Sequence, residues 1–307
     1  MLQHRIFTLK QDSFILSGED VQRWCNGMLT NNIRSMKSGQ VKRTAYCNDR
    51  GHVQGLAAIQ CIDNERFQLV GDGTSYEEFN DRFSMFMMLD DIECIQSSSE
   101  ILSLQGPLSN EILKKVGADI PEEGLYSVWQ DVTIYQRDRC GLGGWDIVGA
   151  ELTEAKEALI QAGADVGEEQ ELDRLRTLAG LPKWPQDGTE KTFLHELGLN
   201  TACCAFDKGC YVGQEIINRM DIKQIFNRKI LRINLSNSVP VNSRLFVPNQ
   251  LRKPVGILTS TADNEQGHYG LGLIRKKCWE PGTILSVYPP GDSTDTKIAD
   301  ATVLEIT

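Results

Sequence analysis

The stretch DKGCYVGQEIINRM places a lysine, a thiol and two glycines directly before an amphipathic run. Lys208 and the N-terminus of the following helix would favour the anionic form of Cys210, the form that attacks electrophiles and binds metals. A structural interpretation accounts for the same residues: Cys210 and Tyr211 would fill a core, while Gly209 and Gly213 would allow close backbone approach. The residues alone leave both interpretations open.

The run after the thiol is expected to form a helix that supports this site. Its inward-facing stripe would consist of Ile216, Ile217 and Met220. Glu215 and Arg219 are four residues apart and can pair on one face, while Gln214 faces elsewhere. Gly209 and Gly213, near the start of this helix, could leave backbone N–H groups free to receive an anion. A ligand that carries a carboxylate would fit such a site.

Two other kinds of chemistry are weakly supported by the sequence. Structural zinc sites use closely spaced pairs of Cys or His, but the only cysteine cluster is Cys203, Cys204 and Cys210, and the four histidines lie far apart. We therefore expect no bound metal and a buried structural role for Cys203 and Cys204. The glycines that begin at Gly141 lack the G-x-G-x-x-G spacing of a nucleotide-binding loop, so a turn between two strands explains them better.

The composition indicates a soluble cytoplasmic protein with reduced thiols. There is no signal-peptide pattern, no run of 18 apolar residues, and an odd number of cysteines, nine, in 307 residues. The formal net charge of −10 disfavours direct binding of nucleic acid, which would require a local basic patch. Three short basic clusters exist, and solvated strand ends explain them about as well: residues 228–229, 252–253 and 275–277.

The hydrophobic pattern predicts an α+β protein with a C-terminal β-barrel. Helices are expected at residues 19–29, after a capping box at Thr74–Glu77, at 108–116, from 153 to a stop at 163, and around 172–178. Strand-like runs start at residues 66, 101, 132 and 144, an order that suits ferredoxin-like units. From about residue 229, six short strand-like segments broken by Gly, Pro and Asn predict a small antiparallel barrel. We accordingly place an α+β domain at residues 1–228, with two ferredoxin-like lobes, and a barrel domain at residues 229–307.

The motif Lys-Gly-Cys-Tyr-Val-Gly-Gln-Glu, residues 208–215, resembles the signature of the YgfZ-type folate-binding proteins, which are relatives of the aminomethyltransferase (T-protein) of the glycine cleavage system. The resemblance extends over nearly the whole chain. It includes the segments LSGEDVQRWCNGMLTNNI, CNDRGHV, LQGPLSNEIL, LDRLRTLAGLP, VGILTS and GLGLIRKK.

The resemblance implies a three-lobed ring of ferredoxin-like elements and a β-barrel, with tetrahydrofolate or a derivative bound near its centre. It also implies a role in assembling or repairing certain iron–sulfur proteins, including enzymes that modify tRNA, with Cys210 as the residue on which this role depends. Lys208 would favour the thiolate, and Gln214, Glu215 and Arg219 would organise the start of the helix. The expected folate-binding or anion-binding residues are Lys208, Gly209, Tyr211, Gly213, Gln214, Glu215 and Arg219.

Three positions depart from the wider superfamily and keep two alternatives open. Gln54 and Gly55 stand where the glycine-cleavage enzyme has paired aspartates, and neither can hold a negative charge beside a tetrahydrofolate nitrogen. Leu178 stands where relatives have a glutamate that binds the pterin. One alternative is a folate-dependent transferase that moves an aminomethyl or methyl group with other residues. The other is a scaffold that binds client enzymes without folate.

Overall fold

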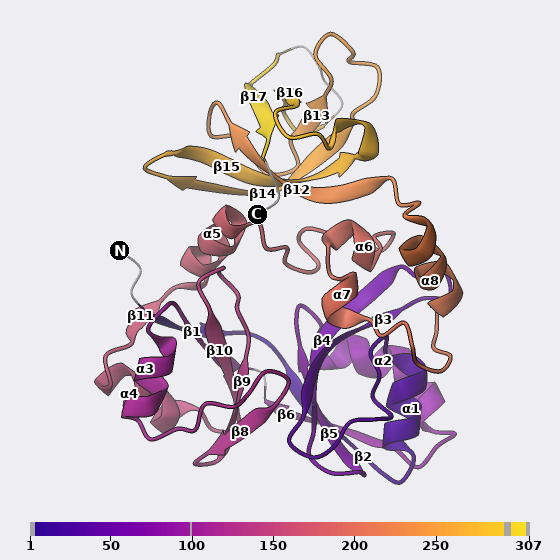
Figure 1. Ribbon diagram of the computed structural model, residues 1–307, viewed down its shortest axis with the longest axis vertical. Helices are drawn as coiled ribbons and strands as arrows, with labels where there is room; N and C mark the ends of the chain where they lie inside the picture. The colour runs from indigo at the N-terminus through magenta and orange to yellow at the C-terminus, as the bar shows by residue number, and fades with distance from the viewer. Residues whose placement is uncertain (1–3, 99, 292–295, 305–307) are drawn as a thin grey trace. The chain divides into compact units, whose positions relative to one another are not determined.

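The computed structural model describes residues 4–98, 100–291 and 296–304 (Figure 1). The chain forms two compact units. The first contains residues 1–172 and 201–214, and the second contains residues 173–200 and 215–307. The first unit holds two β-sheets, and the second holds a closed barrel.

A five-stranded antiparallel sheet forms one half of the first unit, in the order β3-β4-β5-β2-β6. Its elements are β2 (Ser13–Ser17), α1 (Val21–Met28), β3 (Val41–Cys47), β4 (Val53–Cys61), β5 (Arg66–Gly71), α2 (Tyr76–Met87) and β6 (Glu93–Ser98). Apart from the added edge strand β3, their chain order is strand, helix, strand, strand, helix, strand. That is the order of a ferredoxin-like unit, as the sequence predicted.

Aromatic side chains of α2 fill the core beside this sheet. Phe79 and Phe83 lie one turn apart on the buried face of α2, with ring centroids 4.7 Å apart. Both rings pack edge-on against Tyr46. The predicted helix is confirmed, but its capping box is one residue later than expected, because Ser75 caps the helix and Glu78 closes the box.

A six-stranded sheet forms the other half of the first unit, in the order β11-β1-β7-β10-β9-β8. Its elements are β1 (Arg5–Leu9), β7 (Ile101–Gln105), α3 (Ser109–Lys115), β8 (Tyr126–Trp129), β9 (Val132–Gln136), β10 (Gly144–Val148), α4 (Thr153–Gln161) and β11 (Asp165–Gly167). The N-terminal strand β1 lies between β11 and β7, parallel to the first and antiparallel to the second. Sequence patterns identified β7, β9 and β10 but not β1, whose sheet neighbours are more than 90 residues away.

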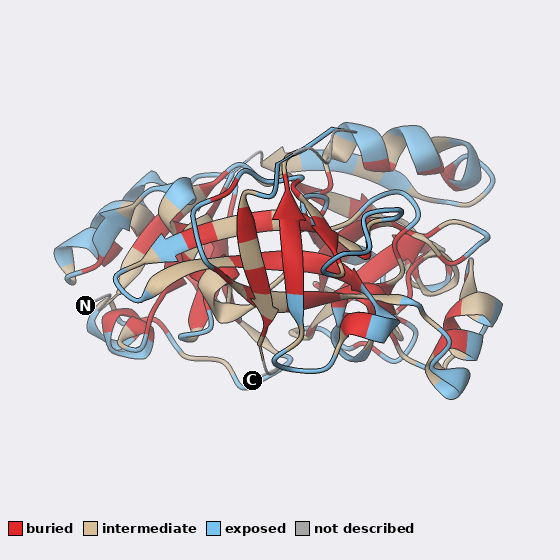
Figure 2. Ribbon diagram, turned by 90° about the horizontal axis from the view of Figure 1, so that it is seen from above, coloured by how far each residue is buried: buried red, intermediate tan, exposed pale blue. Residues whose placement is uncertain are grey.

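The second unit contains the predicted barrel, closed in the order β12-β15-β14-β13-β16-β17. Its strands are β12 (Arg228–Leu235), β13 (Arg244–Phe246), β14 (Gly256–Asn264), β15 (Gly267–Arg275), β16 (Ile284–Tyr288) and β17 (Ala299–Val303), with a 3-10 turn at Lys276–Cys278. Apolar side chains fill its interior. Many residues of its strands are buried (Figure 2). All six strand predictions are confirmed, although residues 305–307 of the last predicted segment lie outside the described residues.

Four helices lie between the second sheet and the barrel along the chain. They are α5 (Glu169–Ala179), α6 (Leu194–Leu197), α7 (Asn200–Cys203) and α8 (Gln214–Lys223). The second compact unit therefore includes residues before 228, whereas the barrel strands themselves begin at Arg228. The division into domains at residue 228 stays a prediction. No helix in the described ranges is long and apolar enough to span a bilayer.

Candidate functional site

Lys208 places its ammonium group among backbone carbonyls at the end of α1. Its Nζ donates hydrogen bonds to the carbonyl oxygens of Asn26 (2.7 Å), Leu29 (2.6 Å) and Asn31 (2.7 Å). Because α1 ends at Met28, the carbonyls of its last turn lack partners within the helix. A cation at this end also interacts favourably with the helix dipole. Lys208 therefore caps α1 across about 180 residues of sequence.

This arrangement changes the role assigned to Lys208. An ammonium group has three N–H donors, and carbonyls take all three, so none remains for the sulfur of Cys210. Lys208 therefore anchors the segment, while the prediction that its charge favours the thiolate of Cys210 stays a prediction. Burial lowers the pKa of the Lys208 ammonium to about 8, and the nearby Cys204 and Cys25 thiols oppose that shift. The ring of Tyr211 lies 4.9 Å from Nζ and supplies a cation–π contact.

Backbone hydrogen bonds fix the rest of this segment to the same helix end. The amide of Val212 donates to the carbonyl of Gly27 (3.3 Å), and the amide of Ala205 donates to the carbonyl of Thr30 (3.1 Å). The hydroxyl of Thr30 in turn donates to the carbonyl of Cys203 (2.6 Å). Residues 203–212 are thus bound at several points to residues 26–31. We name residues 203–213 the anchored segment.

The two glycines of the motif have different roles. Gly213 has φ = +83°, and a Cβ there would lie 2.6 Å from the carbonyl oxygen of Asn48 and 2.9 Å from the Cα of Gly51. Only glycine fits this backbone conformation and contact without strain. At Gly209 a Cβ would meet nothing within 4 Å. The prediction of a close backbone approach is therefore confirmed for Gly213 and wrong for Gly209.

The side chains of Cys210 and Tyr211 differ in burial. Tyr211 is buried, including its hydroxyl, which agrees with the interpretation in which it fills a core. Cys210 is exposed, which contradicts the interpretation in which it fills a core. All nine cysteines lie within the described residues; seven are buried, Cys94 is half-buried, and only Cys210 is exposed. The anchored segment therefore presents one accessible thiol on a fixed backbone.

Of the remaining predicted residues, Gln214 is the one that organises the start of α8. Its side-chain amide donates to the carbonyls of Lys208 (3.3 Å) and Gly209 (3.4 Å), which closes the loop around the thiol. Glu215 and Arg219 are exposed, and in the described part of the chain they form no ion pair with each other, contrary to expectation. The apolar stripe of α8 is narrower than predicted. Ile217 and Met220 are buried, whereas Ile216 is half-buried.

The structure explains one of the three departures from the superfamily, the glycine at position 55. A Cβ at Gly55 would lie 2.3 Å from the ring of Tyr46 and 2.4 Å from the hydroxyl of Thr74, so an acidic side chain would not fit there. The side-chain carbonyl of Gln54 accepts a hydrogen bond from Arg82 (2.9 Å). Leu178 is half-buried on α5. No carboxylate therefore stands at any of the three positions.

Sequence reasoning missed a buried charge cluster in the first unit. It consists of Arg43, Asp72, Arg137, Arg139 and Asp146. Arg43 lies on β3 and Asp72 follows β5. Arg137 and Arg139 lie in the loop between β9 and β10, and Asp146 lies on β10. Segments from both sheets meet here. No spacing in the sequence signals the cluster, because its members are spread over about 100 residues.

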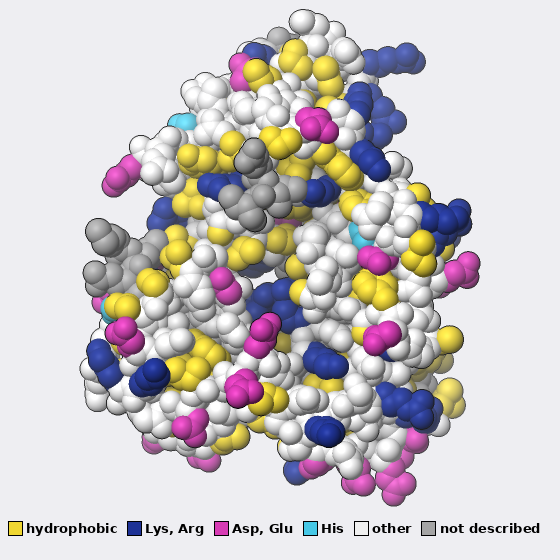
Figure 3. Space-filling view, in the orientation of Figure 1, with side chains coloured by type: hydrophobic (Ala, Val, Ile, Leu, Met, Phe, Trp, Pro, Cys, Tyr) yellow, Lys and Arg dark blue, Asp and Glu magenta, His cyan; other side chains and the backbone are white. Residues whose placement is uncertain are grey.

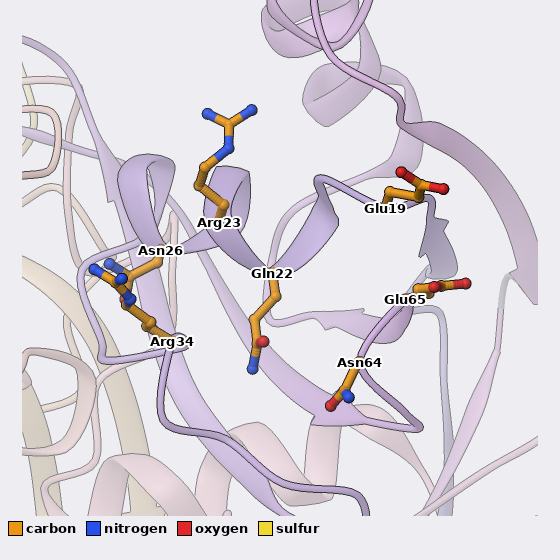
Figure 4. Close-up of a pocket in the computed structure, with 7 residues that line it drawn as sticks. All are labelled: Glu19, Gln22, Arg23, Asn26, Arg34, Asn64 and Glu65. Atoms are coloured by element: carbon orange, nitrogen blue, oxygen red, sulfur yellow. The ribbon is translucent and has the colours of Figure 1, made fainter.

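A pocket of about 590 Å³ lies beside α1 and contains none of the predicted site residues (Figure 4). Its lining residues are Glu19, Gln22, Arg23, Asn26, Arg34, Asn64 and Glu65. The side chain of Asn26 is already engaged, since it accepts hydrogen bonds from the amides of Ile33 and Arg34. Across the described ranges no group of three or more His, Cys, Asp or Glu residues could hold a metal ion.

Charged side chains of both signs alternate over the face shown in Figure 3. Two of the three basic clusters become neighbours on the barrel, because Arg228 pairs with Arg275 in the register of β12 and β15. Glu196 neutralises Arg228 at 2.8 Å.

The two β-sheets and the six-stranded barrel form an aminomethyltransferase-like fold. The structure matches that of the glycine cleavage system aminomethyltransferase T from Bartonella henselae with a TM-score of 0.84, over 99% of this chain and 86% of that one, at 17% sequence identity. Residues 10–208 match the family described as GCVT N-terminal domain. The chain belongs to this family.

Two curated relatives cover most of the chain. An aminomethyltransferase from Geobacillus sp. (strain WCH70) is 24% identical over 307 residues, covering 93% of this chain and 82% of the relative. A chloroplastic protein of Arabidopsis thaliana, named as transferase At1g60990, is 25% identical over 286 residues. The alignment covers 89% of this chain but only 65% of the Arabidopsis protein.

Proposed function

We propose that the protein is a YgfZ-type accessory protein that binds a reduced folate and supports assembly or repair of iron–sulfur clusters, and through it tRNA modification. Cys210 would be its reactive group. The observation that carries this proposal is the single exposed thiol on the anchored segment. A fixed backbone holds such a thiol ready for a partner without the entropy cost of ordering a loop.

The residues fit a bound folate in one respect and not in another. Folates carry carboxylates, and Arg43 offers a largely buried guanidinium that donates no hydrogen bond to the described residues. A folate would supply one-carbon chemistry or reducing equivalents when bound. However, the room for a carboxylate that would activate a folate nitrogen is missing at Gly55. We therefore expect binding of the folate without the amine chemistry of glycine cleavage.

Aminomethyl or methyl transfer remains the second candidate function, and the aminomethyltransferase relative that is covered over 82% of its length favours it. The packing around Gly55 argues against it. Turnover of a methyl or aminomethyl donor in the presence of tetrahydrofolate would distinguish this transferase function from the accessory function proposed above. A third candidate, a scaffold without folate, predicts that tetrahydrofolate does not bind at all. The cytoplasmic location stays a prediction.

The test has two parts, carried out on the full chain. Titration with tetrahydrofolate, followed by fluorescence of the five tryptophans, is expected to give saturable binding. Transfer of a cluster to an apo client protein is then compared for wild type and Cys210→Ala, with Cys94→Ala as a thiol control. We expect Cys210→Ala to lose transfer while its melting temperature stays unchanged. Equal transfer by the two variants would refute the role of this thiol.

A further inference from the structure

Three arginines surround two aspartates in the charge cluster of the first unit. Asp146 is fully buried and well satisfied: it accepts hydrogen bonds from Ser103 (2.8 Å), Tyr135 (3.2 Å) and two nitrogens of Arg139 (2.7 and 2.9 Å). Arg139 also donates to Asp72 (3.1 Å). Its side chain is 10% exposed, and its guanidinium pairs with both aspartates.

Asp72 is the shared partner of all three arginines. Burial by itself would raise the pKa of this carboxyl, but the charges of Arg137, Arg139 and Arg43 hold the pKa well below its usual range. Arg137 forms a short ion pair with one oxygen of Asp72, and Arg139 bonds to the other. Both carboxylate oxygens therefore have a closer partner than Arg43.

Arg43 is left with the weakest interactions in the cluster. Its nearest carboxylate oxygen, on Asp72, is 3.7 Å away, beyond hydrogen-bonding distance. A guanidinium has five N–H donors, and within the described ranges none from Arg43 reaches an acceptor. Burial, followed by the charge of Arg137, lowers the pKa of Arg43. With two carboxylates for three guanidiniums, the cluster has one positive charge in excess.

Arg43 has the most exposed side chain of the three arginines. The side chain of Arg43 is 28% exposed, compared with 14% for Arg137 and 10% for Arg139. The backbone of Arg43 is also connected to the anchored segment. Asn31 donates its side-chain amide to the carbonyl of Arg43 (2.8 Å) and offers its own carbonyl to Lys208 (2.7 Å).

We propose that Arg43, with Arg137 beside it, forms a binding site for an oxyanion, a carboxylate or a phosphate, which supplies the missing negative charge. Planar guanidinium groups suit such anions because they donate two parallel hydrogen bonds. Two sources provide this chemistry: the glutamate carboxylates of a reduced folate, and free phosphate. The folate source rests on the proposed function, whereas the phosphate source does not.

The test measures affinity by calorimetry for four probes: inorganic phosphate, N-(4-aminobenzoyl)glutamate, tetrahydrofolate, and tetrahydropteroate, which lacks the glutamate. Wild type is compared with Arg43→Gln, and Arg34→Gln serves as the control, because Arg34 is exposed and pairs with no carboxylate in the described residues. We expect Arg43→Gln to weaken at least one anionic probe about tenfold or more, and Arg34→Gln to leave every affinity unchanged.

The pattern of probes separates the sources and the two proposals. Arg43-dependent binding of aminobenzoylglutamate and tetrahydrofolate, but not of tetrahydropteroate, supports the folate source. Arg43-dependent binding of phosphate alone supports the phosphate source, and then the proposed folate function fails while this inference holds. Tetrahydrofolate that binds equally to wild type and Arg43→Gln, with no Arg43-dependent phosphate binding, overturns the inference and leaves the folate function intact.

Stability without ligand gives an independent readout. Removing an excess buried charge is expected to leave the melting temperature of Arg43→Gln equal to or above that of wild type. A variant that melts well below wild type would overturn the inference, because Arg43 would then already stabilise the fold in the absence of a bound anion. Arg43→Lys keeps the charge but not the paired donors, and is expected to recover only part of the affinity.

Discussion

Replacing Lys208 by Met tests whether this lysine anchors the segment to the end of α1. The change keeps the length and apolar stem of the side chain and removes the ammonium. Three carbonyls at the end of α1 would lose their donor at once: those of Asn26, Leu29 and Asn31. If Lys208 is an anchor, the fold of the first unit should lose stability.

The magnitude follows from the number of hydrogen bonds. A hydrogen bond to a charged group contributes about 1.5–3 kcal/mol, and a buried acceptor left without a donor costs about 1–3 kcal/mol. These contributions do not add fully, and removing the ammonium also removes the cost of burying its charge. Because three acceptors lose their donor together, we expect a loss of about 3–5 kcal/mol. The melting temperature of a unit of this size would fall by roughly 10 °C.

Lys42 provides a matched control in the same unit. Its Nζ donates to one carbonyl, that of Asn32 (2.8 Å), whereas Lys208 donates to three. Lys42→Met is therefore expected to cost less, about 1.5 kcal/mol, and the difference between the variants reports the capping of α1.

The assay combines urea denaturation with amide hydrogen exchange. Denaturation gives the free energy of unfolding, and exchange shows where protection is lost. In Lys208→Met we expect faster exchange at residues 26–31 and in the anchored segment, with little change in the barrel. A Lys208→Met protein as stable as Lys42→Met, with wild-type protection at the end of α1, would refute the capping argument.

Three further predictions follow from the same site. A thiol reagent added to the native protein is expected to modify one cysteine rapidly, and none in Cys210→Ala; mass spectrometry of the labelled peptides checks this, and rapid labelling elsewhere would contradict it. Gly213→Ala is expected to cost about 2 kcal/mol or more in urea denaturation, because it combines a positive φ with a close contact, whereas Gly209→Ala should cost about 1 kcal/mol or less. In the folded protein the pKa of Lys208 is about 8, below its ordinary value of 10.5. Between these two pH values the unfolded chain therefore binds more protons than the folded protein. The stability of the wild type relative to Lys208→Met should consequently rise with pH in that window. A stability difference that stays flat or falls from pH 8 to 10 would contradict the direction of this shift.

Elements with a clear local pattern were predictable from the sequence. Helix α2 repeats its buried residues at helical spacing, and the barrel strands are short, apolar and bounded by turn residues. Both patterns depend on neighbours within a few residues. Strand β1 and strand β3 lack that support, because their place depends on distant partners, such as β7 and β11 for β1.

The motif drew attention to Cys210 as a candidate site, but it did not show how the residues around the thiol are arranged. The sequence also left the exposure of Cys210 open. The groups that bind Lys208 are backbone carbonyls, which every residue has, so no pattern of residue types can predict them. Gly209 and Gly213 are equivalent in the sequence, and only the backbone conformation shows that one of them is required.

Neighbouring side chains of the anchored segment have different roles. Lys208 and Tyr211 point inward and hold the segment to α1, while Cys210, between them, points outward. Because the thiol contributes little to packing, removing it should leave the fold intact. Because the lysine contributes most of the anchoring, removing it should loosen the thiol without touching it. Activity and stability can therefore be separated by substitutions two residues apart. If Cys210→Ala instead destabilised the protein as much as Lys208→Met, the thiol would belong to the anchor, and the assignment of chemistry to this segment would lose its basis.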